Sequence, residues 1–510
     1  MAPFFVAAGT RYEVSLQPLS GAVLPPLALH AVRVGLESAP PDATPDPMAF
    51  ANRVRASPVL ASRIDEPADL AVVETRPSGG RAGARQPAST AAAKARRPSS
   101  HVVLLATATV IAEGVRQTDL AAAKNMGARI VEEGFDGKVL FRVDTVARAF
   151  DLVELLLSRE VGAVSPNFLR RIIRPRASRP TAPWAQAKIG VSAAWAITKG
   201  NPDVRVAVLD EGVDTAHPAL RPAVVAERDF IGGKGNSAMP DGNDAHGTAC
   251  AGIIVSRDAA LPGIAPRCSL IAARIAMDDG TGQQWVFDDF ATADAIDWSW
   301  RQGAAVLSNS WGGGAPSDAI SRAFGRARTQ GRNGLGAVVA IAAGNGQLPI
   351  DFPGDLPGYV TVGASTPRDE RKTKTSSDGE NWWGSNFGPT LSLLAPGVFI
   401  STTDISGPSG YDPGDFTKTF NGTSSATPHV AGAAALMLSA NPGLSAPTVR
   451  TMLGQTAKTI AGQTGWTPEL GFGRLDVARA VSVSKAALTP GKRPAARRRT
   501  PRPKKKARRR

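Results

Sequence analysis

The chain has 510 residues, of which 43% are apolar and 20% are charged, and its formal net charge at pH 7 is +15. This composition is typical of a globular protein of two to four domains and excludes wholesale disorder. Residues 491–510 hold 12 Lys or Arg and no acidic residue, so the rest of the chain is nearly neutral. Cys250 and Cys268 are too few for a disulfide framework, although one bridge between them stays open.

The N-terminal part divides by composition into four segments. Residues 1–75 carry no readable motif and are assigned as an accessory region of unknown role, and the Gly, Ala, Pro, Ser and Arg of residues 76–100 predict a disordered linker. Residues 101–173 alternate strand-like runs at 101–110 and 138–143 with a helical pattern at 146–160, which predicts a small α+β domain. Residues 174–183 are basic and proline-bearing, and they predict an exposed linker that is accessible to proteases.

Apolar runs alternate with helical patterns from residue 184 to residue 484. Strands are expected at 204–210, 268–275, 304–310, 337–345 and 359–365, and helices are expected from His246, over 284–302 and from Thr423. Continuous Val, Ile and Ala runs separated by helices indicate an α/β fold with a doubly wound, mostly parallel sheet. In such folds the chemistry lies beyond the carboxyl ends of the strands. Residues 485–510 are expected to form a disordered basic tail.

Four polar residues stand at those predicted strand ends and helix starts: Asp210, His246, Asn345 and Ser424. Each alone has an ordinary structural explanation, such as a turn-capping Asp or a helix-capping Ser. Together they supply an acid, a base, an amide donor and a hydroxyl. A serine hydroxyl becomes a useful nucleophile at neutral pH when an adjacent base removes its proton, so the combination points to nucleophilic catalysis.

The segments VAVLDEGVDTAHPAL, AHGTACAGI, AAGNG and NGTSSATPHVAG resemble the subtilisin-like serine proteases (subtilases, peptidase S8) over residues 184–484. The resemblance implies a serine endopeptidase with Ser424 as nucleophile, His246 as general base and then acid, Asp210 as its orienting partner, and Asn345 in the oxyanion hole. Ala245 and Ser425 depart from the family pattern without removing a catalytic atom, and Glu211 puts a second negative charge where the family usually has a small hydroxyl residue. Pro428 is expected in the first turn of its helix, where a missing N–H does no harm.

Substrate-binding residues also follow from the resemblance. One wall of the peptide-binding cleft would be Gly280, Thr281 and Gly282, and the other Ser310, Trp311 and Gly312. A role for Trp311 as a core residue is equally open. Cys250 lies one helical turn after His246 and is interpreted as a small buried apolar residue without a catalytic role.

The resemblance also bears on partners and cofactors. Residues 101–173 stand where the family carries its propeptide, so they would block the cleft before cleavage in residues 174–183; a permanent accessory domain is the alternative. No cofactor is required, and calcium stays open as a stabilising ion with no assigned site. We expect protein or peptide substrates, and residues 485–510 would attract nucleic acid or another acidic partner.

Other readings of function and location stay open. A subtilase-fold transpeptidase would use the same residues, and a non-hydrolytic binding protein would act through its basic tail. No membrane span and no classical signal peptide are visible, so the location is expected to be cytoplasmic or reached by non-classical export.

Overall fold

The computed structural model describes residues 12–18, 70–77, 103–173, 184–278, 284–313, 316–460 and 462–488. Three of the predicted substrate-binding residues, Gly280, Thr281 and Gly282, lie outside the described residues. So do the predicted linker at 174–183, nearly all of the linker at 76–100, and residues 489–510 of the basic tail.

A seven-stranded sheet with the strand order β15-β14-β13-β12-β7-β9-β8 forms the centre of the larger unit, and all its neighbouring strands pair in parallel. The predicted α/β fold class is thereby confirmed. The direction of winding reverses between β7 and β12, which puts a topological switch point at their carboxyl ends. The strands are β7 (Arg205–Asp210), β8 (Val224–Asp229), β9 (Ser269–Arg274), β12 (Ala304–Asn309), β13 (Val338–Ala342), β14 (Val360–Ser365) and β15 (Leu391–Pro396).

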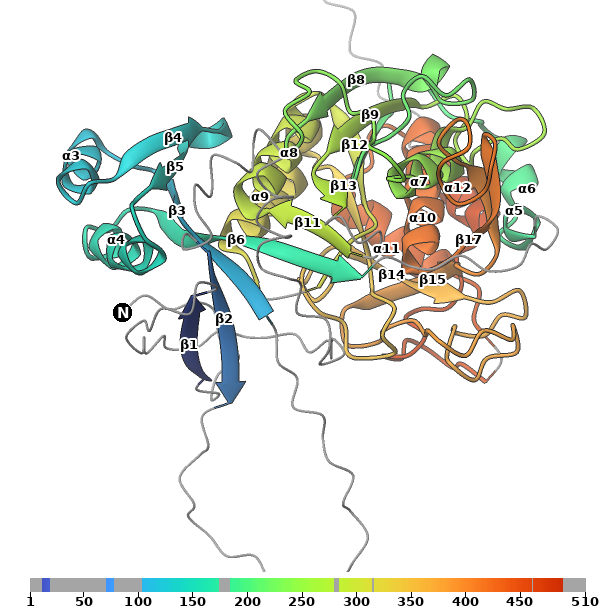
Figure 1. Ribbon diagram of the computed structural model, residues 1–510. Coiled ribbons are helices and arrows are strands. Elements are labelled where there is room, and N and C mark those ends of the chain that lie inside the picture. The colour runs from blue at the N-terminus through green and yellow to red at the C-terminus, as the bar shows by residue number, and fades with distance from the viewer. Residues whose placement is uncertain are drawn as a thin grey trace, which may run out of the picture.

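Helices cover both faces of this sheet, as parallel strands require. Helices α8 and α9 lie on the face toward the N-terminal unit, while α7 and α10 lie on the opposite face with the remaining helices (Figure 1). Each face has its own apolar core. The helices are α5 (Ala185–Lys188), α6 (Val191–Trp195), α7 (His246–Val255), α8 (Asp289–Arg301), α9 (Asp318–Gln330), α10 (Thr423–Ala440), α11 (Ala446–Thr456) and α12 (Val477–Ala486).

The sequence prediction of one helix over 284–302 is wrong in its first part. Residues Gln284–Asp288 form strand β11, and α8 begins only at Asp289. The aromatic and β-branched residues of QWVFD favour a strand. Asp288 then ends that strand and caps the helix, because its side chain accepts a hydrogen bond from Ala291 N.

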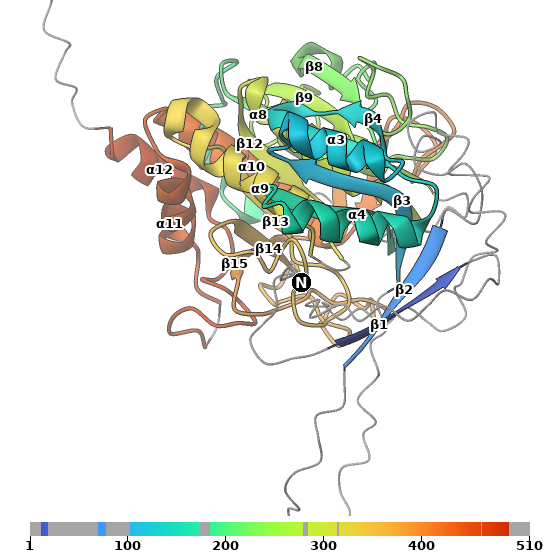
Figure 2. The ribbon, with the colours of Figure 1, turned by 90° about the vertical axis from the view of Figure 1, so that its left-hand side faces the viewer.

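The N-terminal unit is a small α+β structure that rests on α8 and α9. Helices α3 and α4 cover its outer face (Figure 2), and β3 and β6 pair antiparallel along its middle. Ile111 and Leu140 of this unit belong to the same apolar core as α8 and α9, so the two units share a core. Its elements are β3 (Val103–Glu113), α3 (Gln117–Asn125), β4 (Arg129–Glu133), η2 (Phe135–Gly137), β5 (Lys138–Arg142), α4 (Val146–Ser158) and β6 (Ala163–Ile173).

The sheet of the N-terminal unit extends in both directions beyond residues 103–173. On one side β2 (Leu70–Pro77) pairs with β3, and β1 (Tyr12–Pro18) pairs with β2. On the other side β6 pairs antiparallel with β11, which pairs with β10 (Ala276–Asp278). One sheet therefore joins strands of the predicted accessory region, the predicted α+β domain and the predicted catalytic domain.

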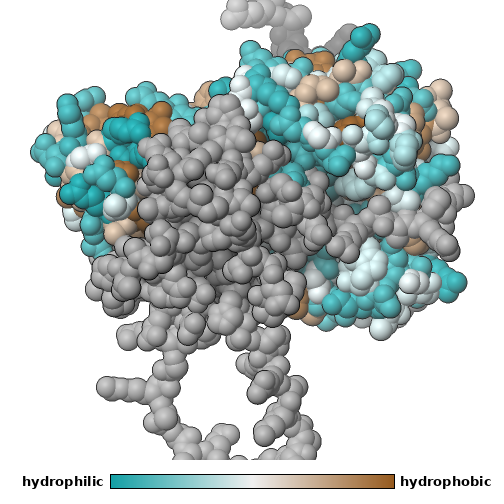
Figure 3. All heavy atoms as spheres, viewed as in Figure 1, coloured by the Kyte–Doolittle hydropathy of each residue, from teal (hydrophilic) through white to brown (hydrophobic). Residues whose placement is uncertain are grey.

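A two-stranded sheet and two short helical turns complete the fold: β16 (Ile400–Thr403) with β17 (Phe416–Phe420), η3 (Arg221–Ala223) and η4 (Gly331–Gly334). The coloured surface in Figure 3 is mainly hydrophilic to neutral, with only small hydrophobic patches. Within the described part of the chain, none of the helices has the length and apolar content needed to cross a membrane.

Candidate active site

Asp210 and His246 meet in the interior at the carboxyl edge of the parallel sheet. Asp210 is the last residue of β7 and His246 is the first of α7. His246 Nδ1 lies 2.8 Å from Asp210 Oδ1, and their side chains are each 1% exposed. The same carboxylate oxygen accepts a hydrogen bond from Glu211 N at 2.9 Å, which fixes its orientation. His246 Nε2 has no hydrogen-bond partner among the described residues.

Ser424 lies beside this pair, at the second residue of α10. The thiol of Cys250 bridges the two, because its Sγ is 3.8 Å from His246 Nδ1 and 3.6 Å from Ser424 O. In this structure Ser424 Oγ donates to Ser310 O at 3.1 Å. Burial raises the pKa of the Cys250 thiol well above its usual value, and the charge of Asp210 adds to the effect, so Cys250 is an uncharged packing residue.

Pro428 has a consequence that the sequence analysis missed. It is the sixth residue of α10, beyond the first turn where it was expected, because the helix begins at Thr423. Without an N–H it cannot bond to the carbonyl four residues earlier, which is that of Ser424. Ser310 Oγ donates to this carbonyl at 2.9 Å instead. The proline therefore lets the side chain of Ser310 hold the backbone of the nucleophile.

Asn345 is held beside the start of α10 by its carbonyl oxygen. Its Oδ1 accepts hydrogen bonds from Thr423 N at 2.8 Å and Thr423 Oγ1 at 3.1 Å. The amide nitrogen is thus left as the donor of this side chain. Ser424 N is one of the first N–H groups of α10, which have no acceptor within the helix. Two donors, the Asn345 amide and Ser424 N, therefore stand at the start of α10, the helix that carries Ser424.

Aromatic rings flank the imidazole of His246 on two sides. Its ring centroid lies 4.5 Å from that of Trp285 on β11 and 5.2 Å from that of Phe420 on β17, both in edge-on geometry. Neither aromatic residue was identified from the sequence, because they lie far from His246 along the chain and no motif links them. Their packing confines the imidazole to the orientation in which Nδ1 faces Asp210.

Glu211 directs its carboxylate to the backbone rather than to the imidazole. Its Oε1 accepts a hydrogen bond from His246 N at 2.7 Å, at the N-terminus of α7. A carboxylate at this end of a helix satisfies a backbone N–H and interacts favourably with the helix dipole. Glu211 therefore helps to place the start of the helix that carries His246.

The predicted cleft residues Ser310, Trp311 and Gly312 follow directly after β12. Ser310 contacts Ser424 through both its hydroxyl and its carbonyl. The indole of Trp311 is buried between Phe324, with which it stacks, and Phe287. This packing favours the core role for the Trp311 side chain.

The acidic side chains of the described residues show whether the structure offers a binding site for calcium. Among the described residues, Asp210, His246 and Cys250 form the one group of three or more ligating side chains close enough for an ion, and their N and S atoms are poor ligands for calcium. A second acidic group, Asp229, Asp241 and Asp244, surrounds the buried guanidinium of Arg274. That arginine already supplies the cation, so we assign no calcium site.

Comparisons with known proteins identify the family of this chain. A sequence model of the subtilase family, Peptidase_S8, matches residues 201–473. The calcium-dependent protease of Trichormus variabilis is 30% identical over 384 residues, which cover 66% of this chain and 56% of that protein. Thermitase of Thermoactinomyces vulgaris is 33% identical over 279 residues, which cover 54% of this chain and 88% of thermitase.

Solved structures give the same fold. Fervidolysin of Fervidobacterium pennivorans, a keratinolytic enzyme related to subtilisin, superimposes with a TM-score of 0.61 at 24% identity, over 74% of this chain and 61% of fervidolysin. The chain thus spans a little over half the length of the calcium-dependent protease that it matches. Since the family model covers more than half of the chain, the chain belongs to the subtilase family of serine proteases.

Proposed function

We propose that this protein is a serine endopeptidase that cleaves peptide bonds through an acyl-enzyme on Ser424. The observation that carries the proposal is the buried 2.8 Å contact between His246 Nδ1 and Asp210 Oδ1 beside the start of α10. Donation of the Nδ1 proton to Asp210 leaves the lone pair on Nε2, so the imidazole can act as a base. In this structure Ser424 Oγ donates to Ser310 O and not to His246 Nε2. In unliganded enzymes the hydrogen bond between nucleophile and base is often long and tightens only when substrate binds.

The proposed reaction proceeds in two balanced steps. Ser424 Oγ forms a bond to the scissile carbonyl carbon while His246 Nε2 takes the hydroxyl proton of Ser424. His246 then gives this proton to the leaving amine as the C–N bond breaks. In the second step, a water molecule attacks the acyl-enzyme carbonyl while His246 Nε2 takes a proton from the water. His246 then returns the proton to Ser424 Oγ, and the carboxylic acid product is released. The Asn345 amide and Ser424 N would stabilise the tetrahedral oxyanion.

We propose that the N-terminal unit inhibits this site. Its strand β6 pairs with β11, which carries Trp285 next to His246. An extended peptide bound to a free strand edge is a common mode of substrate recognition. Because β6 occupies this edge of β11, a substrate peptide could pair with the same edge only after the N-terminal unit has been released.

The test compares the wild type with Ser424→Ala, using Ser425→Ala as the matched control. After cleavage within residues 174–183 has released the N-terminal unit, we expect the wild type and Ser425→Ala to degrade casein and to react with a fluorophosphonate probe, and Ser424→Ala to do neither. Product masses separate hydrolysis, which adds water, from transpeptidation, which does not. Casein cleavage by Ser424→Ala at the wild-type rate would refute the proposal.

A further inference from the structure

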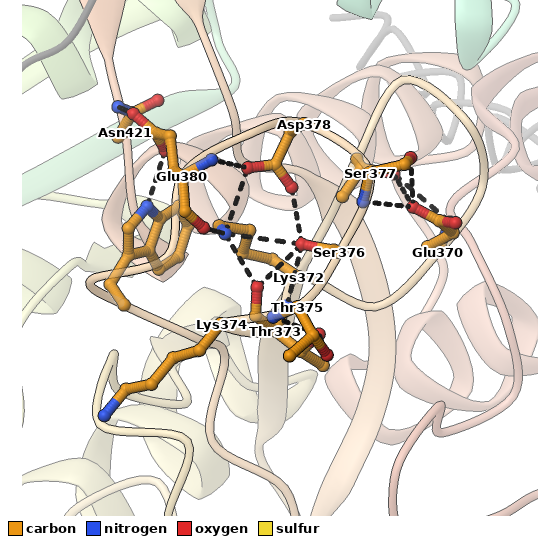
Figure 4. Close-up of polar contacts among 12 residues, drawn as sticks. Glu370, Lys372, Thr373, Lys374, Thr375, Ser376, Ser377, Asp378, Glu380 and Asn421 are labelled. Carbon is orange, nitrogen blue, oxygen red and sulfur yellow. Dashed lines mark hydrogen bonds and ion pairs between the residues drawn. The ribbon is translucent and has the colours of Figure 1, made fainter.

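The loop between β14 and β15 is built around a buried lysine. The Lys372 side chain is fully buried, and its Nζ lies 2.8 Å from Thr373 O and 3.0 Å from Asp378 Oδ1. Ser376 Oγ and the Glu380 carbonyl also accept from Nζ, so the ammonium is surrounded by oxygen atoms of its own loop (Figure 4). A buried charge that is paired and hydrogen-bonded in this way fixes the groups around it. The loop is therefore a rigid structure.

From this loop Glu380 extends its side chain toward the segment that precedes the nucleophile (Figure 4). Its Oε1 accepts a hydrogen bond from Asn421 Nδ2 at 2.9 Å, and its Oε2 accepts one from Trp383 Nε1 at 2.6 Å. Glu380 is 6% exposed. A carboxylate in such surroundings makes strong hydrogen bonds, because a charged acceptor is stronger than a neutral one and little water competes.

Asn421 stands three residues before Ser424, in the turn that connects β17 to α10. Its Oδ1 accepts from Phe399 N at 2.6 Å, so its side chain is held at both ends. Gly422 follows with a φ of 112° and donates its N–H to Gly397 O at 2.9 Å. Thr423 N donates to Asn345. Each of residues 421–423 is thus held by a hydrogen bond of its own. Glu380 makes the hydrogen bond that joins Asn421 to the loop around Lys372.

We propose that Glu380 is a positioning residue for the nucleophile: it holds Asn421 and thereby the backbone that sets Ser424 Oγ and Ser424 N. This inference rests on the proposed serine peptidase function. The effect should fall on the chemical step, because the proposed peptide-binding elements, β11 and Ser310–Gly312, do not include the loop. A displacement of about 1 Å at a reacting group can cost about 100-fold in rate.

The primary test replaces Glu380 by Ala and uses Glu370→Ala as its control. Glu370 belongs to the same loop and accepts from Ser377 N and Ser377 Oγ at 3.2 and 2.6 Å, a comparable number of hydrogen bonds (Figure 4). We expect Glu380→Ala to lower kcat and the fluorophosphonate labelling rate by about 10- to 100-fold, with KM changed by less than about twofold. Glu370→Ala should label within about twofold of the wild type, and both variants are compared at a temperature at which circular dichroism shows them fully folded.

A rescue experiment separates positioning from general loss of structure. Glu380→Gln keeps one oxygen for Asn421 but turns an NH2 group toward Trp383 Nε1, which is also a donor. We expect Glu380→Gln to label slowly and Glu380→Gln/Trp383→Phe to label faster than the single variant, because the phenyl ring removes the competing donor. A double variant that is slower than Glu380→Gln would contradict the proposed arrangement.

Asn421→Ala cuts the same hydrogen bond from the other side and serves if Glu380→Ala fails to fold. Where both single variants fold, the double variant Glu380→Ala/Asn421→Ala should label no more slowly than Asn421→Ala, because Asn421→Ala already removes the hydrogen bond to Glu380 together with the one from Phe399 N. Labelling at the wild-type rate by folded Asn421→Ala or Glu380→Ala would overturn the inference while leaving the function of Ser424 intact. A wild type that neither labels nor cleaves casein after cleavage within residues 174–183 has released the N-terminal unit would instead refute the peptidase function and this inference with it.

Discussion

The interface between the N-terminal unit and the catalytic unit contains a buried lysine whose removal should open the protein. Lys138 begins β5, its side chain is fully buried, and its Nζ lies 2.5 Å from Asp297 Oδ2 and 3.6 Å from Asp294 Oδ1 on α8. Burial alone would raise the pKa of Asp297, but the ion pairs with Arg326 and Lys138 hold it below its usual range. Asp297 is therefore ionised at neutral pH and depends on these two cations.

The size of the effect follows from what Lys138→Met leaves behind. Methionine keeps most of the aliphatic volume but no charge, and removing one partner of a buried ion pair typically costs about 3–5 kcal/mol. Asp297 retains Arg326, whose Nη2 and Nε lie 2.7 and 2.9 Å from its two oxygens. We therefore expect a smaller cost than this, about 2–3 kcal/mol, which corresponds to a roughly 30- to 150-fold larger open population.

The assay is the rate at which the full-length chain, before any cleavage, reacts with a fluorophosphonate at Ser424. If the N-terminal unit covers the site, Lys138→Met should label faster than the wild type by about the same 30- to 150-fold. Lys124→Met is the control, because Lys124 is an exposed lysine in the same unit. Equal labelling rates for Lys138→Met, Lys124→Met and the wild type would refute the reasoning, since the ion pairs would then not hold a covering domain.

Three further predictions concern the catalytic unit. Burial lowers the pKa of His429 to about 4, whereas a histidine in the unfolded chain has a pKa of about 6.5 and is protonated first as the pH falls. The free energy of unfolding should therefore decrease between about pH 6.5 and pH 4, and in urea unfolding it should decrease less steeply with pH for His429→Gln. An equally steep decrease in the variant would exclude His429 as the source. Arg274→Met leaves the buried carboxylate of Asp229 without its ion pair, while Asp241 keeps Lys234, and it should cost about 3–5 kcal/mol in chemical denaturation; a loss below about 1 kcal/mol would contradict its role. Gly422→Ala introduces a side chain where φ is 112°, so it should slow labelling of the nucleophile, whereas Gly465→Ala, whose new methyl group meets no atom within 4 Å, should not.

Much of the fold was predictable because its signals are local. The apolar runs that become β7, β9, β12, β13 and β14 are continuous because these strands are covered on both faces, and α7 begins at the predicted His246. The four candidate site residues were singled out for a related reason. Asp210 ends β7, His246 starts α7, Ser424 is the second residue of α10 and Asn345 follows the end of β13 by three residues, and parallel strands bring their carboxyl ends to one edge. The error over 284–302 arose because a short aromatic run does not distinguish a strand from a helix by periodicity alone.

Contacts between distant segments were decided only by the tertiary structure. No local pattern indicates that Glu380 meets Asn421, that Lys138 meets Asp297, or that Ser310 takes the carbonyl that Pro428 leaves free. The sequence by itself was enough to identify the candidate catalytic residues, because the ends of strands and the starts of helices are marked by a few neighbouring residues. How firmly those residues are held depends on partners that only chain packing brings within hydrogen-bond distance, and hydrogen bonds act over about 3 Å whatever the separation in sequence.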